Sequence, residues 1–223
     1  MTRTRLKDRL LPDYTKGEEI FNAVSHIVGA GLSLCALAAA VIKAALWGNA
    51  WDVVGGCIYG ASLVLLYAVS GIYHALRKGT GKKVMQVLDH CVIYVLIAGT
   101  YTPILFSALR PVAPVRTWVL FGVVWGVAAV AITFTAIDLK KYAVFSMICY
   151  IGMGWCVVSA WKTVVSALHP VGLQLLLWGG IAYTVGAVLY GLGSRRRYMH
   201  GAFHVFVVAG SVLQFLCIFL YVI

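Results

Sequence analysis

The chain has 223 residues, of which 62% are hydrophobic and only 11% are charged, and its mean hydropathy is +0.92. A soluble domain carries about 25% charged residues, so this composition excludes an ordinary cytosolic globule, a disordered chain and a conventional DNA-binding domain. The formal net charge of +11 arises from 18 Lys and Arg residues against 7 Asp and Glu residues. Such a charge indicates either an anionic partner or, in a membrane protein, the orientation of the loops.

Seven apolar stretches are each long enough to cross a bilayer, which takes about 20 mostly apolar residues. We predict an all-α fold, an integral membrane bundle of seven transmembrane helices within residues 20–223. Residues 1–19 are predicted to form an N-terminal arm. In chain order, the predicted spans are residues 20–42, 52–76, 85–109, 117–137, 142–161, 171–192 and 200–222.

The basic residues alternate between loops instead of gathering on one face. Four of them fall in the first, third and fifth loops, namely Lys43, Arg110, Arg116 and Lys162. The other fourteen fall in the arm and in the second, fourth and sixth loops: Arg3, Arg5, Lys7, Arg9, Lys16, Arg77, Lys78, Lys82, Lys83, Lys140, Lys141, Arg195, Arg196 and Arg197. The positive-inside rule then predicts a multi-pass protein of the plasma (inner) membrane with a cytoplasmic N-terminus and an outer C-terminus. Orientation accounts for most of the charge, so we expect no nucleic-acid partner. Asp138 is expected to pair with Lys140 or Lys141 at the interface.

Ionisable side chains at membrane depth cost about 2.5–3.5 kcal/mol each on insertion scales, so their positions carry information about function. With the predicted orientation, His169 alone among the six histidines falls on the outer side. The other five fall in one layer near the cytoplasmic side, together with Ser70 and Asp89: His26, His74, His90, His200 and His204.

The spacing of His200 and His204 is i, i+4, which places both rings on one helical face, as in helical metal sites. An imidazole from His74 would complete a set of three ligands with an open fourth position, the pattern of catalytic zinc sites. Imidazole also suits copper, iron and nickel, so the ligand type favours Zn²⁺ without proving it. The alternative is that these histidines lie at the headgroup level as half-hydrated residues at the ends of spans.

Several neighbouring residues have two interpretations. Asp89 either belongs to the metal site or is a first-turn residue favoured by the helix dipole. Glu18, Asn22 and His26 share one helical face, which either lines a vestibule or is a solvated helix start. We interpret His26 as a hydrogen-bonded structural histidine instead of a fourth ligand. His90, next to Asp89, is expected in the surroundings of the site.

Short motifs follow one another in a fixed order along the spans. They are GEEIFNAVSH at residues 17–26, SGIYH at 70–74, LDH at 88–90, IY at 93–94, AGTYTP at 98–103 and HGAFHVF at 200–206. Together they resemble the hemolysin III family, the bacterial branch of the progestin and adipoQ receptor (PAQR) proteins, over essentially the whole chain. Two positions depart from the pattern of many relatives: Gly201 replaces an acidic residue, and Gln214 replaces a histidine.

The resemblance implies a zinc ion near the cytoplasmic side, held by His74, His200 and His204. It also implies that Asp89 and Ser70 surround the water of that site. The wider group looks similar to alkaline ceramidases, which implies hydrolysis of a lipid amide. The hemolysin name implies membrane lysis, and the receptor branch implies signalling.

These observations lead to two competing hypotheses. In the first, the protein is a zinc-dependent hydrolase of lipid amides or esters, with Asp89 as general base and Ser70 positioning Asp89 or stabilising the oxyanion. In the second, it is a hemolysin-like pore, a channel or a lipid-sensing receptor in which zinc only joins two spans. A role in membrane homeostasis is compatible with both. The expected partners are membrane lipids, including a lipid substrate or ligand, and assembly into a homo-oligomer is left open.

Overall fold

A computed structural model of the chain describes residues 4–192 and 196–223, so Arg3 and Arg195 lie outside the described residues. Within this part of the chain, seven helical segments are long and apolar enough to cross a membrane. The helices are α1 (Lys16–Trp47), α2 (Ala50–Ala75), α3 (Thr80–Pro103), α4 (Pro114–Ile137), α5 (Ala143–Gly154), α6 (Trp161–Ala167), α7 (Pro170–Leu192) and α8 (Met199–Tyr221), with short helices η1 (Leu6–Asp8), η2 (Ile104–Leu109) and η3 (Cys156–Ala160). The all-α fold with seven helices of spanning length is thereby confirmed.

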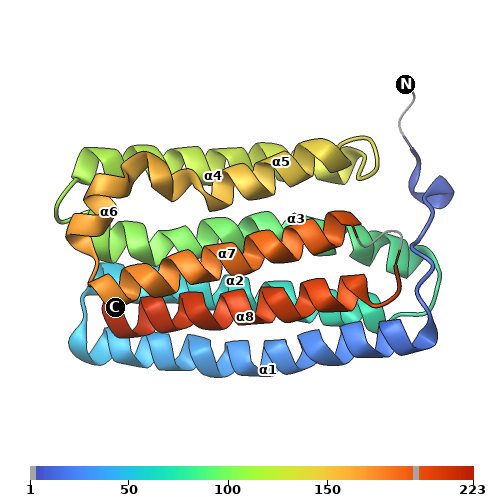
Figure 1. The fold of residues 1–223 in the computed structure, drawn as a ribbon, viewed down its shortest axis with the longest axis horizontal. Coiled ribbons are helices and arrows are strands. Elements are labelled where there is room, and N and C mark those ends of the chain that lie inside the picture. The colour runs from blue at the N-terminus through green and yellow to red at the C-terminus, as the bar shows by residue number, and fades with distance from the viewer. Residues whose placement is uncertain (1–3, 193–195) are drawn as a thin grey trace.

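The helices run side by side along one long axis, and α3 lies near the centre (Figure 1). Helix α1 packs against α2 and α8, α2 against α3, α3 against α4, and α7 against α8. Tyr94 and Ala98 of α3 are fully buried, whereas Leu32, Val119 and Leu220 on the periphery are each more than half exposed. An apolar surface around a packed interior is what a bilayer requires of a helical bundle.

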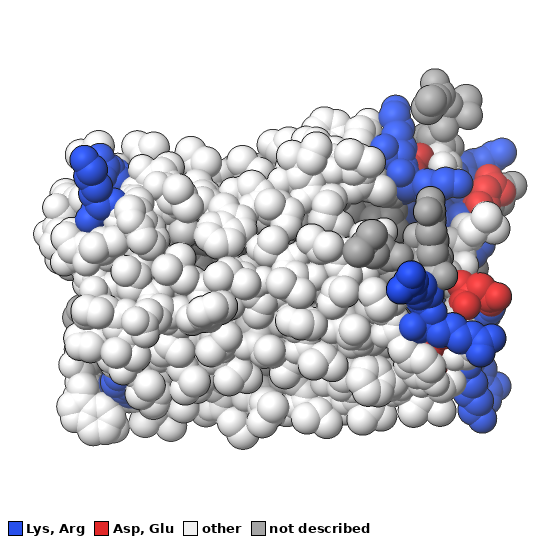
Figure 2. Space-filling model, viewed as in Figure 1, with Lys and Arg blue, Asp and Glu red and all other residues white. Residues whose placement is uncertain are grey.

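Charged side chains lie at the two ends of the bundle (Figure 2). Most of them gather where α1 and α8 begin and α2 ends, which we call the basic end. The C-terminus lies at the opposite end (Figure 1). The middle of the face in Figure 2 carries no Lys, Arg, Asp or Glu, as expected of a surface in contact with lipid.

The fifth span differs from the predicted residues 142–161. It extends over Ala143–Ala167 and is interrupted after Gly154, where α5 ends and η3 begins. The hydroxyl of Tyr101 compensates for the break, because it donates to the carbonyl of Gly154 (2.9 Å) and accepts from the amide of Val157 (2.8 Å). A broken helix is tolerated at membrane depth where side chains satisfy the freed backbone groups.

Residues 4–15 of the arm lie across the basic end, and α1 begins at Lys16, within the segment expected as the arm. The amide of Thr4 donates to Asp138 (2.7 Å), and the guanidinium of Arg9 donates to the carbonyl of Ile137 (3.4 Å). The expected pairing of Asp138 with a lysine side chain is wrong, because its carboxylate instead accepts from the amides of Thr4 and Lys141. The hydrogen bond from Thr4 lowers the pKa of Asp138 to about 2.

Candidate metal centre

Three histidine side chains converge at the basic end of the bundle. His74 lies in the last turn of α2, and His200 and His204 lie on one face of the first two turns of α8. The Nε2 atom of His200 lies 3.2 Å from that of His74 and 3.0 Å from that of His204. Each of the three residues is at most 9% exposed.

The geometry of this cluster fits a tetrahedral metal ion. Zinc–nitrogen bonds of 2.0–2.1 Å on a tetrahedron place two donor atoms about 3.3 Å apart, close to the observed separations. All three donor atoms lie within 4.8 Å of one another. Without a metal, His200 Nε2 would need hydrogen bonds to both His74 and His204. A neutral imidazole nitrogen is either a donor or an acceptor, so it cannot donate to one of these rings and accept from the other. A cation in the centre satisfies all three lone pairs, so the cluster can hold a metal.

Glu19 orients His74 from the other side of the ring. Its Oε2 atom lies 2.8 Å from His74 Nδ1, and its Oε1 atom lies 2.7 Å from the ammonium of Lys82, which is 3% exposed. Lys82 also donates to the carbonyls of His74 (3.3 Å) and Leu76 (3.0 Å) at the end of α2. A carboxylate on the second ring nitrogen fixes the tautomer of a metal-binding histidine.

Sequence reasoning missed Glu19 and selected its neighbour Glu18. The carboxylate of Glu18 caps α1 through Thr15 and accepts from the amide of Tyr198 (2.7 Å). Glu18 therefore holds the start of α8 and not a histidine. Glu19 lies three residues before Asn22 and therefore on the same helical face. This spacing could have identified Glu19 as a residue of the site.

His26 packs against His204, and its environment differs from the hydrogen-bonded one that we expected. The two rings stack with centroids 3.6 Å apart at 14°, and neither nitrogen of His26 has a hydrogen-bond partner among the described residues. His26 is therefore not the hydrogen-bonded histidine that we expected, and it is not one of the three residues whose donor atoms lie within 4.8 Å of one another. Ser25 Oγ lies 3.4 Å from His204 Nδ1. Glu18, Asn22 and His26 are all buried, so they do not form a solvated helix start.

Asp89, Ser70 and His90 lie around the cluster without joining its three donor atoms. Ser70 is 2% exposed, and the side chain of Asp89 is 13% exposed. His90 Nδ1 donates to the carbonyl of Gln86 (2.8 Å), and its Nε2 lies 3.0 Å from the hydroxyl of Tyr190. Both nitrogens of His90 therefore already have partners.

A cavity of about 170 Å³ joins the histidine cluster to the middle of the bundle. One end is lined by His26, Ser70, Asp89, His90, His200 and His204. The rest of its wall is mostly apolar and extends to Gln214, which lies ten residues after His204 on α8, or about 15 Å along the helix. A long apolar cavity with polar groups at one end can hold a chain-like apolar molecule with one polar group.

The structure gives a reason for the residues at positions 201 and 214, where the resemblance implies other side chains. A Cβ at Gly201 would lie 2.7 Å from the ring of Phe21, so an acidic side chain does not fit there unless Phe21 moves. The Nε2 of Gln214 donates to the carbonyl of Leu176 (3.0 Å), and its Oε1 has no partner among the described residues. A Cβ at Gly179 would lie 2.6 Å from that Nε2, so the absence of a side chain at Gly179 makes room for the amide of Gln214.

Comparison with known proteins places this architecture in one family. The family model described as "Haemolysin-III related" matches residues 14–215. The "Hemolysin-3 homolog" of Bacillus subtilis (strain 168) is 38% identical over 208 residues, which cover 93% of this chain and 96% of that protein. "Hemolysin-3" of Bacillus cereus is 40% identical over 205 residues, covering 92% of each chain. The human "Monocyte to macrophage differentiation factor" is 27% identical over 212 residues, covering 92% of this chain and 84% of that protein.

The matched residues include α1, α2 and the first turns of α8, which together build the histidine cluster. The chain is therefore a multi-pass membrane protein that belongs to the haemolysin-III-related family.

Proposed function

We propose that this protein is a zinc-dependent hydrolase that cleaves an amide or ester bond of a membrane lipid. One observation carries the proposal: three buried imidazoles converge, and two of them, His200 and His204, line one end of an apolar cavity that Asp89 and Ser70 also line. A lipid that enters this cavity with its apolar chain would bring its polar linkage to the histidines.

The fit of the three imidazoles to a tetrahedral ion supports zinc as the metal. Zinc held by three protein ligands with a fourth position open lowers the pKa of a water molecule and polarises a carbonyl. Asp89 is the carboxylate at the same end of the cavity, and we assign it the role of general base that accepts the proton of the attacking water. We assign Ser70, one turn before His74, the role of positioning Asp89 or stabilising the developing oxyanion.

The apolar wall of the cavity supports a lipid as the substrate. It excludes water from the bond that reacts and binds the acyl chain through burial of apolar surface. We further propose that the basic end faces the cytoplasm in the plasma membrane, because this end carries most of the Lys and Arg side chains. In this orientation the polar product leaves toward the cytoplasm and the enzyme adjusts the lipid composition of the membrane.

The test uses purified full-length protein in lipid nanodiscs with added zinc and a panel of acyl amides and acyl esters. We expect release of free fatty acid, measured by mass spectrometry. Asp89→Asn should lower the rate by about 10²–10⁴-fold while zinc stays bound. The matched control is His169→Ala, which removes the histidine that stacks on Tyr221 at the opposite end. An absence of any zinc-dependent product over the whole panel would contradict the hydrolase.

The names of the two Bacillus relatives favour a second candidate, a protein that permeabilises membranes. In that case zinc would join α2 to α8 without chemistry, and the apolar cavity would bind a lipid without cleaving it. Dye leakage from liposomes that is abolished by His74→Ala, together with intact lipids in the same sample, would support this candidate over the hydrolase.

A further inference from the structure

The three histidines of the cluster are held in place by different means. Glu19 contacts the Nδ1 atom of His74 at 2.8 Å, and Ser25 lies 3.4 Å from the Nδ1 atom of His204. The Nδ1 atom of His200, however, has no hydrogen-bond partner among the described residues, although it is buried. The orientation of the His200 ring therefore depends on packing.

The ring that stacks on His200 belongs to the N-terminal arm. Tyr14 lies with its centroid 5.0 Å from that of His200 at an interplanar angle of 23°, a stacked arrangement. Tyr190 and Phe203 also contact His200, but their rings are tilted by 58° and 42°. Tyr14 reaches the second histidine as well, because its centroid lies 5.8 Å from that of His74. Stacked aromatic rings at this distance attract each other beyond the effect of burial.

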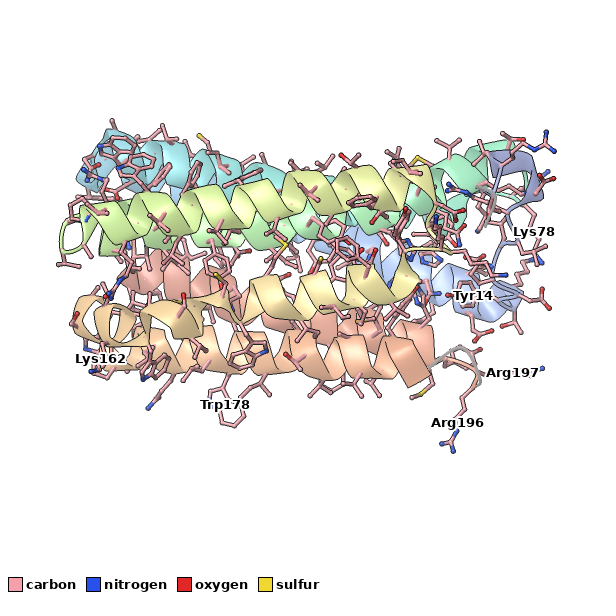
Figure 3. The ribbon with its side chains drawn as sticks, turned by 90° about the horizontal axis from the view of Figure 1, so that it is seen from above. Tyr14, Lys78, Lys162, Trp178, Arg196 and Arg197 are labelled. Carbon is pink, nitrogen blue, oxygen red and sulfur yellow. The ribbon has the colours of Figure 1, made fainter. Side chains whose placement is uncertain are left out.

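Two neighbours hold Tyr14 in this position. Asp13 forms an ion pair of 2.8 Å with Lys78, in the loop that follows His74. Thr15, on the other side, caps α1 together with Glu18. Tyr14 and Lys78 both lie at the basic end, whereas Lys162 lies at the opposite end (Figure 3). The Asp13–Lys78 pair is exposed and contributes weakly, so the arm is docked by several small contributions.

We propose that Tyr14 is a positioning residue of the metal centre, whose ring holds His200 in the orientation that directs Nε2 at the metal. The inference rests on the metal site of the proposed function. Because the docked arm favours the metal-binding arrangement of His200, the bound metal must favour the docked arm to the same degree. Docking of an arm outside the spans and metal binding inside the bundle are therefore one coupled equilibrium.

The first measurement is the dissociation constant of Zn²⁺ for the full-length protein in nanodiscs, by competition with a chromophoric chelator. Tyr14→Ala should weaken zinc binding by about tenfold, the lower end for residues that support metal ligands. Tyr14→Phe keeps the stacked ring and should bind zinc as the wild type does. The control is Tyr142→Ala, which removes an aromatic ring that packs on Phe134 and Phe145 at the same end.

The second measurement is cleavage of the arm by trypsin after Arg9, read as the appearance of a chain that begins at Leu10. Arg9 is 8% exposed when the arm is docked, so cleavage reports undocking. We expect faster cleavage after zinc removal in the wild type. Tyr14→Ala should cleave fast with or without zinc. Asp13→Asn should speed cleavage only slightly, because the exposed Asp13–Lys78 pair contributes weakly to docking.

Wild-type zinc affinity in Tyr14→Ala would overturn the proposal, as would a Tyr14→Phe variant as weak as Tyr14→Ala. Zinc-independent cleavage after Arg9 in the wild type would overturn the coupling. Both readouts are independent of lipid turnover. A negative result therefore leaves the hydrolase standing, and a protein without hydrolase activity whose zinc affinity still follows Tyr14 supports the inference alone.

Discussion

Glu19 contacts both His74 and Lys82, so replacing it should change both the stability of the protein and its affinity for zinc. These two effects can be measured separately. Glu19→Gln removes the carboxylate that orients His74 and that neutralises Lys82, which is 3% exposed. Removing one partner of a buried pair costs about 3–5 kcal/mol, because the other charge stays buried without a partner. The side chain of Glu19 is 19% exposed, so we expect the lower limit, about 3 kcal/mol of unfolding free energy. The affinity for zinc should fall by about 10–100-fold, the usual effect of losing a carboxylate behind a histidine ligand.

A second substitution distinguishes the two effects. Glu19→Gln with Lys82→Met removes the unpaired ammonium, and replacing a buried ion pair by apolar groups is often neutral or stabilising. This double variant should regain most of the unfolding free energy but not the zinc affinity. The assays are unfolding in mixed detergent micelles and zinc competition with a chelator. Asp52→Asn is the matched control, because Asp52 caps the start of α2, at the end of that helix away from His74; it should lose about 1 kcal/mol of stability and no zinc affinity. If the double variant regains its zinc affinity, Glu19 acts through Lys82 and the orientation of His74 by the carboxylate is refuted.

Three further predictions concern the surroundings of the site. Gly201→Ala should destabilise the protein by about 1–3 kcal/mol, because the added methyl group overpacks on Phe21. Adding Phe21→Ala should recover part of the lost melting temperature. An unchanged melting temperature in Gly201→Ala would contradict the close approach of the two residues. His26→Ala should retain the metal, measured by elemental analysis of purified protein, because His26 is not one of the three grouped donor residues; loss of the metal would identify it as a ligand. The pKa of Asp138 is lowered to about 2 by the hydrogen bond from Thr4, below the ordinary value of 3.8, so its contribution is present above pH 4 and is lost as the pH falls from 4 toward 2. Asp138→Asn should flatten this part of the stability–pH curve, and an unchanged slope would argue against the hydrogen bond.

Much of the architecture follows from the order of residues, for a simple physical reason. A bilayer demands about 20 apolar residues for each helix, so hydropathy alone locates seven spans, and helical periodicity places His200 and His204 on one face. The break after Gly154 escaped this reasoning because hydropathy measures the polarity of a segment and not its hydrogen bonds. The hydroxyl of Tyr101, from another helix, makes the interruption tolerable.

The metal centre divides in the same way between local and tertiary information. The sequence by itself brought His74, His200 and His204 to one membrane depth, since depth follows from span boundaries. Depth and helical face do not determine which of two adjacent carboxylates meets a histidine. The packing of α1 against α2 and α8 decides that Glu19 contacts His74, while Glu18 contacts Tyr198. Only the tertiary structure decided that Tyr14 lies on His200, because a contact between residues 186 positions apart depends on how the arm folds back over the bundle.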